Sequence, residues 1–367
     1  MSAIEMSPLI PYFSRRINSE SLYRISPKRM AQAIDVSIDL GEEERNPTKG
    51  IPGYFAYGWR SAANRIIHAN TLGVEYISLR FISSANRNNN IEAGLILFEE
   101  TLQNILASIG SVPVKMIVDP FGLALTEDGQ WGVRDNNGNF DKEQTHNLLE
   151  KVGFILSRNH VHGVVTLGRL PEEVMLTKKG ISKAGDYTKI YSFSQNSETS
   201  TAYVYLDAVG HNTGQKIMPG NVKEMDLWAL LDIWHGTDVS VIKPMESFHL
   251  MSSLRYLVEN ETAREQFLNS PDVRDMAQKN AFVAKSLAEM NASPLELSLK
   301  CSRIKMAGYT VSGTTYMLAL LAHEKGPEMA RARMEEMWIT ALGVMDEQCE
   351  CLIDRNVVKY LEGSILA

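Results

Sequence analysis

The chain has 367 residues, of which 44% are hydrophobic and 22% charged, and its formal net charge is −7 at pH 7. This composition is ordinary for a globular protein, and the length suits two domains or one large α/β barrel. The acidic balance argues against a nucleic-acid surface or a polybasic membrane anchor. No run approaches the roughly 18 apolar residues that span a bilayer, and the N-terminus lacks a signal-peptide core, so we expect a cytoplasmic protein.

The three cysteines, Cys301, Cys349 and Cys351, are odd in number and lie late in the chain. Their number and placement predict a reducing compartment and no disulfide framework. Cys349 and Cys351 have no partner cluster nearby, so we interpret the pair as incidental and not as half of a metal site.

Residues 1–32 are polar, with basic side chains between scattered hydrophobic ones. We expect an extended arm that orders on a partner subunit, because its apolar side chains would be exposed if the arm were free. The arm therefore predicts a homo-oligomer. The apolar side chains are those of Leu9, Ile10, Tyr12, Phe13, Leu22 and Tyr23.

From Ala33 onward, strand-like and helix-like segments alternate. Alternating or β-branched runs predict strands at 33–40, 74–81, 112–119, 162–167, 189–193, 239–243, 308–312 and, as a short candidate, 351–353. Helical patterns lie at 60–72, 91–109, 142–158, 222–234, 246–258, 315–324 and 327–347. Such alternation, repeated about eight times, predicts a (β/α)8 TIM barrel with a closed parallel sheet over residues 33–367.

One crossover, the sixth, is longer than a single helix requires. Residues 245–302 have room for two or three helices, including 259–267 and 273–290. We expect a helical insertion beside the barrel. Its mixed charges are typical of a solvated face or a subunit contact.

The strand at 239–243 has the most informative end. Mostly β-branched residues run into Lys243, and Pro244 stops the strand, which is typical of a buried parallel strand with a cation at its C-terminal tip. Burial disfavours a charged amine, so we expect the pKa of Lys243 to fall and its neutral amine to form a Schiff base with a ketone. The alternative is a structural lysine that reaches a carboxylate at the barrel rim.

Active sites of such barrels lie at the C-terminal ends of the strands, which places further polar residues near Lys243. Arg169 and Arg355 are candidate ligands for a substrate carboxylate, although arginines at barrel rims also join structural ion pairs. Asp119 ends the third predicted strand and is a candidate acid or base. Ser192, at the tip of the fifth, is expected to hydrogen-bond a bound carbonyl or, alternatively, a neighbouring backbone group.

Short motifs in a fixed order point to a known family. They are Ile51-Pro52-Gly53, Asp119-Pro120-Phe121, Gly129-Gln130-Trp131-Gly132, Ser192-Phe193, Asp207-Ala208, Asn221, Val241-Ile242-Lys243-Pro244 and Tyr309-Thr310-Val311-Ser312-Gly313. Over residues 20–360 the chain resembles porphobilinogen synthase, also called 5-aminolevulinate dehydratase. The resemblance implies a cytoplasmic (β/α)8 barrel whose N-terminal arm builds a homo-oligomer. It also implies condensation of two 5-aminolevulinate molecules into a pyrrole through lysine Schiff bases, with Lys243 at one of the two lysine positions.

The sequence departs from the family's pattern at several site positions. The family's other Schiff-base lysine is replaced by Asn196, which cannot form an imine but can hydrogen-bond a substrate. An arginine that handles a substrate carboxylate becomes Leu206. The segment 168–174, which contains Arg169, replaces an acidic catalytic motif.

The zinc-binding cysteines of some family members are also missing. Their places fall on Ile117, Asp119 and Trp131, which cannot form a thiolate zinc site. We therefore expect a metal-independent protein with no cofactor beyond a lysine Schiff base.

The resemblance adds four candidate residues. Ser312 is expected to present its hydroxyl and nearby N–H groups to a carboxylate, unless it only forms a tight turn, and Tyr309 of the same motif is a candidate substrate contact. Glu198 is a candidate relocated acid or base, against the more common solvated loop carboxylate. His211 lies in the segment that corresponds to the family's lid, where it could act as an acid or base on closure or be a surface histidine.

Three functional hypotheses follow. The first is an enzyme in which Lys243 forms a Schiff base with a small keto or amino-keto acid for aldol-type condensation or dehydration. The second is a non-catalytic paralogue kept as a ligand-binding or assembly subunit. The third is genuine 5-aminolevulinate dehydratase activity in tetrapyrrole biosynthesis by a single-lysine route.

Overall fold

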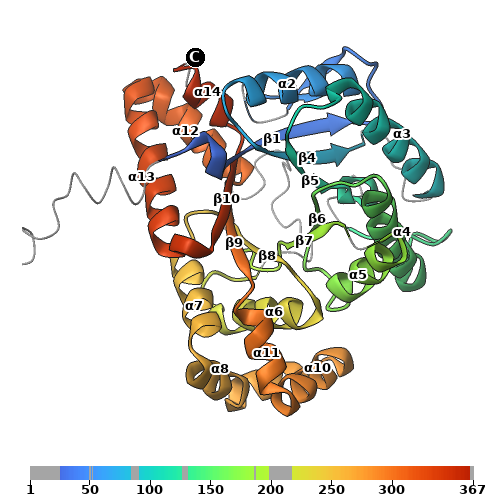
Figure 1. Ribbon diagram of the computed structural model, residues 1–367, viewed down its shortest axis with the longest axis vertical. Coiled ribbons are helices and arrows are strands. Elements are labelled where there is room, and N and C mark those ends of the chain that lie inside the picture. Colours follow the sequence, from blue (N-terminus) through green and yellow to red (C-terminus); the bar gives the residue numbers. More distant parts are fainter. Residues whose placement is uncertain are drawn as a thin grey trace, which may run out of the picture.

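The computed structural model describes residues 25–48, 51, 53–83, 91–125, 131–185, 187–197 and 217–363. Parallel strands form a closed barrel, in which each strand pairs with the next and β10 pairs with β1 (Figure 1). The barrel strands are β1 (Met30–Ser37), β4 (Tyr76–Ile82), β5 (Lys115–Asp119), β6 (Gly163–Thr166), β7 (Lys189–Ser192), β8 (Val239–Ile242), β9 (Lys305–Tyr309) and β10 (Cys349–Asp354). The predicted (β/α)8 barrel is confirmed.

Two short strands extend the sheet beside β1. The first residues of β1 pair with β10, whereas Asp35 and Val36 near its C-terminal end pair with β3 (Phe55–Tyr57). The strand β2 (Arg45–Pro47) then pairs antiparallel with β3. Beyond its pairing with β10, the C-terminal half of β1 therefore still has a paired strand on each side, β3 on one and β4 on the other.

Helices surround the barrel (Figure 1). They are α2 (Trp59–Thr71), α3 (Ile91–Ile109), α4 (Lys142–Arg158), α5 (Glu173–Lys183), α6 (Val222–His235), α7 (Phe248–Glu259), α12 (Ser312–Lys325), α13 (Pro327–Met345) and α14 (Val357–Leu361). The sequence did not predict α5, because Thr177 and Gly180 are weak helix formers in the middle of a short segment. Tertiary packing of its buried side chains overrides this weak local preference.

The helix α6 begins and ends at strong local signals. The side chain of Asn221 accepts a hydrogen bond from the backbone N–H of Glu224, which caps the N-terminus. Gly236 ends the helix in the left-handed region, with a φ of 107°. Between these two residues, α6 is buried on nearly all sides, and its buried side chains include Asp226 and Asp232.

The long crossover after β8 is helical. Beyond α7 it contains α8 (Glu261–Leu268), α9 (Pro271–Gln278), α10 (Ala281–Ala292) and α11 (Pro294–Cys301). The prediction of one continuous helix at 273–290 is wrong, because the chain forms two helices there, α9 and α10. Asn280 separates them, and its side chain caps α10 by accepting hydrogen bonds from the N–H groups of Phe282 and Val283.

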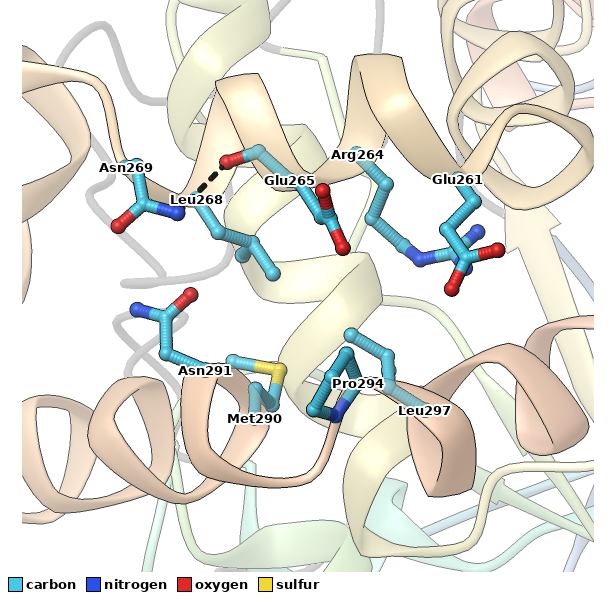
Figure 2. Close-up of a pocket in the computed structure, with 9 residues that line it drawn as sticks. All are labelled: Glu261, Arg264, Glu265, Leu268, Asn269, Met290, Asn291, Pro294 and Leu297. Atoms are coloured by element: carbon cyan, nitrogen blue, oxygen red, sulfur yellow. Dashed lines mark hydrogen bonds between the residues drawn. The ribbon is translucent and has the colours of Figure 1, made fainter.

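A cavity of about 160 Å³ lies within these extra helices. Figure 2 shows side chains of α8 facing those of α10 and the start of α11 across it. Arg264, 3% exposed, donates to the carbonyl oxygens of Leu257 (2.9 Å) and Val258 (3.2 Å) at the end of α7. The insertion is thereby tied to the last turn of α7.

Apolar side chains of the strands and of the inward helix faces form a continuous core. Within the described part of the chain, no helix combines the length and the apolar character needed to cross a bilayer.

The barrel begins earlier than the sequence predicts. β1 starts at Met30, so residues 30–32 belong to the barrel and not to the arm, and the strand ends at Ser37 instead of Leu40. Just before β1, the guanidinium of Arg29 donates to the carbonyl oxygens of Asp346 (2.9 Å) and Cys349 (3.3 Å). Residues 1–24 of the predicted arm lie outside the described residues.

Candidate active site

Lys243 directly follows β8 and points into a buried aromatic environment. The residue is 7% exposed. Its Nζ lies 4.9 Å from the ring centre of Phe193 and 5.9 Å from that of Tyr309. The amine is therefore held at the C-terminal end of the barrel, where the strand ends of such folds converge.

The pKa of Lys243 is lowered to about 7. Burial is the main cause, because a low-dielectric environment penalises the ammonium form. Asp119 opposes this shift, whereas the positive charges of Arg169 and Arg80 add to it. Near neutral pH a large fraction of the amine is thus unprotonated, as carbonyl attack requires.

Three charged side chains lie in one layer of the barrel on three adjacent strands. Asp35 pairs with Arg80 in the β1–β4 ladder, and Arg80 pairs with Asp119 in the β4–β5 ladder. Arg80 contacts Asp35 through two hydrogen bonds, Nε to Oδ1 at 3.0 Å and Nη2 to Oδ2 at 3.2 Å. Burial alone would raise the pKa of Asp35, but Arg80 and Arg355 together hold it below its ordinary value.

Asp119 is the acidic neighbour of Lys243 in this layer. Burial raises the pKa of Asp119, against the opposing effects of the Phe121 N–H, which donates to Oδ1 at 3.0 Å, and of Arg80 and Lys243. Burial therefore disfavours the charged forms of both Asp119 and Lys243. The titrations of the two groups are coupled through their charges.

Arg355 lies at the end of β10 on the other side of Asp35. Its Nη2 is 3.5 Å from Oδ1 of Asp35, and its guanidinium carbon is 6.0 Å from the ring centre of Tyr309. Burial raises the pKa of the Tyr309 hydroxyl, which keeps it protonated. Together with Arg169, these groups form what we call the charged cluster: Asp35, Arg80, Asp119, Arg169, Lys243 and Arg355.

Arg169 is positioned by a loop that wraps around one carboxylate. Glu173, 1% exposed, accepts four backbone hydrogen bonds of 2.7–3.0 Å, from Leu167, Gly168, Arg169 and Leu170. Successive N–H groups turned toward one anion form a nest. The Arg169 guanidinium carbon then lies 5.3 Å from the ring centre of Trp131.

Asn196 lies beside Lys243. The two residues form an isolated parallel bridge, in which the Lys243 N–H donates to the Gln195 carbonyl (3.0 Å) and the Ser197 N–H donates to the Lys243 carbonyl (2.8 Å). Asn196 is buried. The position that the resemblance assigns to a second lysine is therefore adjacent in space to Lys243.

The hydroxyl of Ser192 is engaged away from the charged cluster. It donates to Asp232 of α6 and lies 3.1 Å from the hydroxyl of Ser194. This geometry favours structural partners for Ser192 over the substrate carbonyl that the sequence suggested. They are the side chain of Asp232 and, as in the predicted alternative, a neighbouring backbone group, the N–H of Ser194 at 3.4 Å.

Ser312 begins α12 instead of ending a strand, because β9 stops at Tyr309. It is buried in the first helical turn. Nearby, Asp354 accepts hydrogen bonds from Thr310 (2.6 Å) and Trp338 (3.1 Å), which join the ends of β9 and β10 to α13. A contact between Ser312 and a substrate carboxylate stays a prediction.

Two candidate residues, Glu198 and His211, lie outside the described residues. The same holds for the motif Asp207-Ala208 and for Leu206. The cavity in the insertion is lined by α8, α10 and α11, and none of its lining residues belongs to the charged cluster.

Three residues of this site were not identified from local sequence patterns, namely Asp35, Arg80 and Glu173. The available signal was a charge inside an otherwise apolar strand: Asp35 and Arg80 lie within predicted strands, and buried charges are rare unless they are paired. No local pattern distinguishes Glu173 from its neighbour Glu172, because the nest forms only when the loop folds.

The described residues also bear on a possible metal site. Over the residues that the structure describes, no three His, Cys, Asp or Glu side chains gather as a metal site would require. The cysteines Cys301, Cys349 and Cys351 are buried and free. Metal independence stays a prediction.

No protein-family model matches the chain, and the comparison with curated proteins gives no match. Among solved structures, it is similar to the crystal structure of delta-aminolevulinic acid dehydratase (porphobilinogen synthase) from Toxoplasma gondii ME49 in complex with the reaction product porphobilinogen. The TM-score is 0.72, the sequence identity is 16%, and the match covers 98% of this chain and 92% of that chain. The chain therefore has the (β/α)8 barrel fold of that porphobilinogen synthase.

Proposed function

We propose that this protein is a lyase that forms a Schiff base through Lys243 with a small keto or amino-keto acid. The observation that carries the proposal is the buried amine, whose pKa is lowered to about 7, at the C-terminal end of a barrel strand. A lysine with this pKa is a nucleophile at neutral pH, which an exposed lysine is not.

The chemistry follows from the neighbours of the amine. The neutral amine attacks the ketone carbon, one proton is transferred from the attacking nitrogen to the carbonyl oxygen, and a neutral carbinolamine results. Loss of its hydroxyl as water requires a second proton and leaves the iminium. Asp119, whose pKa is raised by burial and whose charge acts on Lys243, is the proposed proton donor.

The charged cluster favours an anionic substrate. Three guanidinium groups, those of Arg80, Arg169 and Arg355, lie near two carboxylates, those of Asp35 and Asp119. The buried carboxylate of Glu173 also acts on Arg169, so the positive charges are in excess when Lys243 is neutral and Asp119 holds its proton. Buried guanidinium groups pair well with planar carboxylates. We therefore propose a substrate with a carboxylate, and an iminium that serves as electron sink for aldol or dehydration chemistry.

Of the two bridged residues Lys243 and Asn196, only Lys243 has an amine that can form an imine. Asn196 lies beside Lys243 through a backbone bridge, and its amide cannot form an imine. A second substrate, where the reaction uses one, is then held by hydrogen bonds and ion pairs alone.

Reductive trapping tests the proposal. Incubation with levulinate, pyruvate or 5-aminolevulinate followed by borohydride should add one substrate-derived mass to the chain in intact mass spectrometry. With cyanoborohydride, the initial trapping rate should rise with pH through about 7, the pKa of Lys243, and not through the ~10.4 of an ordinary lysine.

The alternatives give different results in the same experiment. A non-catalytic paralogue gives no adduct with any of these ketones. A genuine 5-aminolevulinate dehydratase gives both the adduct and porphobilinogen as product. An adduct whose formation follows an ordinary lysine pKa would contradict the role of the buried amine.

We also propose that the protein needs no metal. Dialysis against a chelator should leave both the circular dichroism spectrum and the yield of trapped adduct unchanged, because the described residues place no metal-binding cluster around Lys243. Elemental analysis of the untreated protein is the control. One tightly held zinc ion per chain would contradict this prediction.

A homo-oligomer built through the N-terminal arm is a further part of the proposal. Because β1 begins at Met30 and Arg29 is bonded to the end of α13 and the start of β10, a truncation should stop before residue 25. Removing residues 1–24 should give a smaller species in light scattering with an unchanged circular dichroism spectrum. An unchanged oligomeric state would contradict it.

A further inference from the structure

Two buried aspartates of α6 are hydrogen-bonded to the segment 192–197, which borders Lys243. Asp226 and Asp232 are 2% and 3% exposed. Burial raises the pKa of each to about 7, which is a sign of the cost of placing a carboxylate there. Neither residue is part of the charged cluster, so their position needs a separate explanation.

Asp232 is bonded to the start of this segment. It accepts from the hydroxyl of Ser192, which in turn accepts from the backbone N–H of Ser194 at 3.4 Å. On the other side of Ser194 lies Gly168, at a φ of +69°, where an added Cβ would be 2.5 Å from the Ser194 Cα. Ser194 is thus held between α6 and the loop that carries Arg169.

Asp226 is bonded to the middle of the segment. Its carboxylate accepts from Nε2 of Gln195 at 3.2 Å and from the hydroxyl of Ser253 in α7 at 2.6 Å. The hydroxyl of Ser240, inside β8, lies 3.5 Å from Oε1 of Gln195. Gln195 is therefore fixed by groups from α6 and β8 at both ends of its amide.

The same segment is bonded to Lys243 through its backbone. The carbonyl of Gln195 accepts from the Lys243 N–H at 3.0 Å, and the Ser197 N–H donates to the Lys243 carbonyl at 2.8 Å. A continuous path of hydrogen bonds therefore runs from α6, through residues 192–197, to the lysine at the end of β8. Its members are all buried.

We propose that Asp226 and Asp232 are positioning residues that hold the segment 192–197 against Lys243, so that Asn196 stays beside the amine and water stays out. Their catalytic significance rests on the proposed Schiff-base function, whereas their effect on the surroundings of Lys243 does not. Loss of either carboxylate loosens the segment, hydrates the amine and moves its pKa back toward the ordinary value.

Competitive labelling with acetic anhydride tests this without any ketone. The fraction of Lys243 that is acetylated is measured by peptide mass spectrometry between pH 6 and 11, which gives the pKa of this one amine. We expect about 7 for the unchanged protein and a rise of about one unit or more in Asp226→Asn and in Asp232→Asn.

Ser192→Ala tests the hydrogen bond between Ser192 and Asp232 from the side of its donor. It removes the donor to Asp232 with little change in volume, so it remains informative if Asp232→Asn does not fold. If Asp232 acts through Ser192, the double variant should shift the pKa no further than Ser192→Ala alone, because both changes act on one interaction, which Asp232→Asn weakens and Ser192→Ala removes.

Asp238→Asn is the matched control. Asp238 accepts from the Ile190 N–H at 2.8 Å, at the opposite end of the β7–β8 pair from Lys243. This variant should lower the melting temperature and leave the pKa of Lys243 unchanged.

Folded Asp226→Asn, Asp232→Asn and Ser192→Ala variants that all retain a Lys243 pKa near 7 would overturn the proposal and leave the aspartates a structural role only. A pKa shift in these variants, in a protein that traps no ketone, would support positioning while refuting the Schiff-base function.

Discussion

Lys243→Met should abolish reductive trapping entirely and leave the barrel folded. Methionine fills a volume similar to that of the lysine stem and keeps contact with the rings of Phe193 and Tyr309, but it has no amine. Within the bridged pair, Asn196 offers no replacement nucleophile. Intact mass spectrometry after borohydride treatment measures the loss, and circular dichroism reports the fold.

Lys243→Arg is the companion variant. Guanidinium stays protonated at every accessible pH, so this variant should fail to trap a ketone as completely as the methionine variant. A reducible adduct in either variant would show that another residue is the nucleophile.

Lys243→Met should also change the pH dependence of the free energy of unfolding. The pKa of Lys243 is about 7 in the folded chain and near 10.4 when unfolded, so between these values the unfolded state binds more protons. The free energy of unfolding of the unchanged protein therefore rises with pH across this window, and the buried ammonium is most costly at pH 7 and below. Lys243→Met should gain most in relative stability at low pH, and urea unfolding at pH 6 and pH 9 measures the difference.

Arg80→Met should destabilise the fold by about 3–5 kcal/mol, because it removes the main partner of a buried carboxylate. Asp35 has a side chain only 5% exposed, and Arg80 supplies both of its short ion-pair contacts. Arg355, at 3.5 Å, remains but contacts only one oxygen. Urea unfolding measures the free energy of unfolding.

The variant should also raise the pKa of Lys243, because it removes one of the positive charges that lower it. The pH dependence of ketone trapping should then move to higher pH. A stability loss without this movement would mean that Arg80 serves the fold alone.

Arg60→Met is a matched control for the stability measurement. Arg60 pairs with Glu42 at 2.8 Å, but the two side chains are 47% and 54% exposed. Solvent screens such a pair, so its loss should cost less than about 1 kcal/mol. The double variant Arg80→Met with Asp35→Leu should recover part of the lost stability, because it also removes the buried carboxylate to which Arg80 is hydrogen-bonded. Equal stability of Arg80→Met and the unchanged protein would contradict the assigned ion pair.

Much of the barrel could be predicted from the sequence because its strands carry strong local patterns. The residues of β8, Val239–Ile242, are all buried and mostly β-branched, and Pro244 ends the run, so both the strand and its tip could be located. The weaker elements could not: α5 contains poor helix formers, and one predicted helix in the insertion is divided by the side-chain cap of Asn280.

For the site, the sequence determined that Lys243 lies at the end of a buried strand, whereas the replacement of a second lysine by Asn196 is a prediction from the family resemblance. The sequence could not determine which side chains meet. Asp35, Arg80 and Asp119 lie far apart in the chain, and only the register of the β1–β4 and β4–β5 ladders places them in one layer. A register shift of one residue would turn each side chain to the opposite face, and a single strand carries no information about its neighbour's register.

The same reason limits what the sequence could predict about the two serines of the site. The sequence placed Ser192 correctly at the end of β7, but only the packing of α6 against that strand brings its hydroxyl to Asp232. Ser312 belongs to α12 because β9 ends at Tyr309. Local sequence thus determined where the chemistry-bearing residues lie along the chain, whereas the contacts that set their charge and orientation depend on elements distant in sequence, which only the closed barrel brings together.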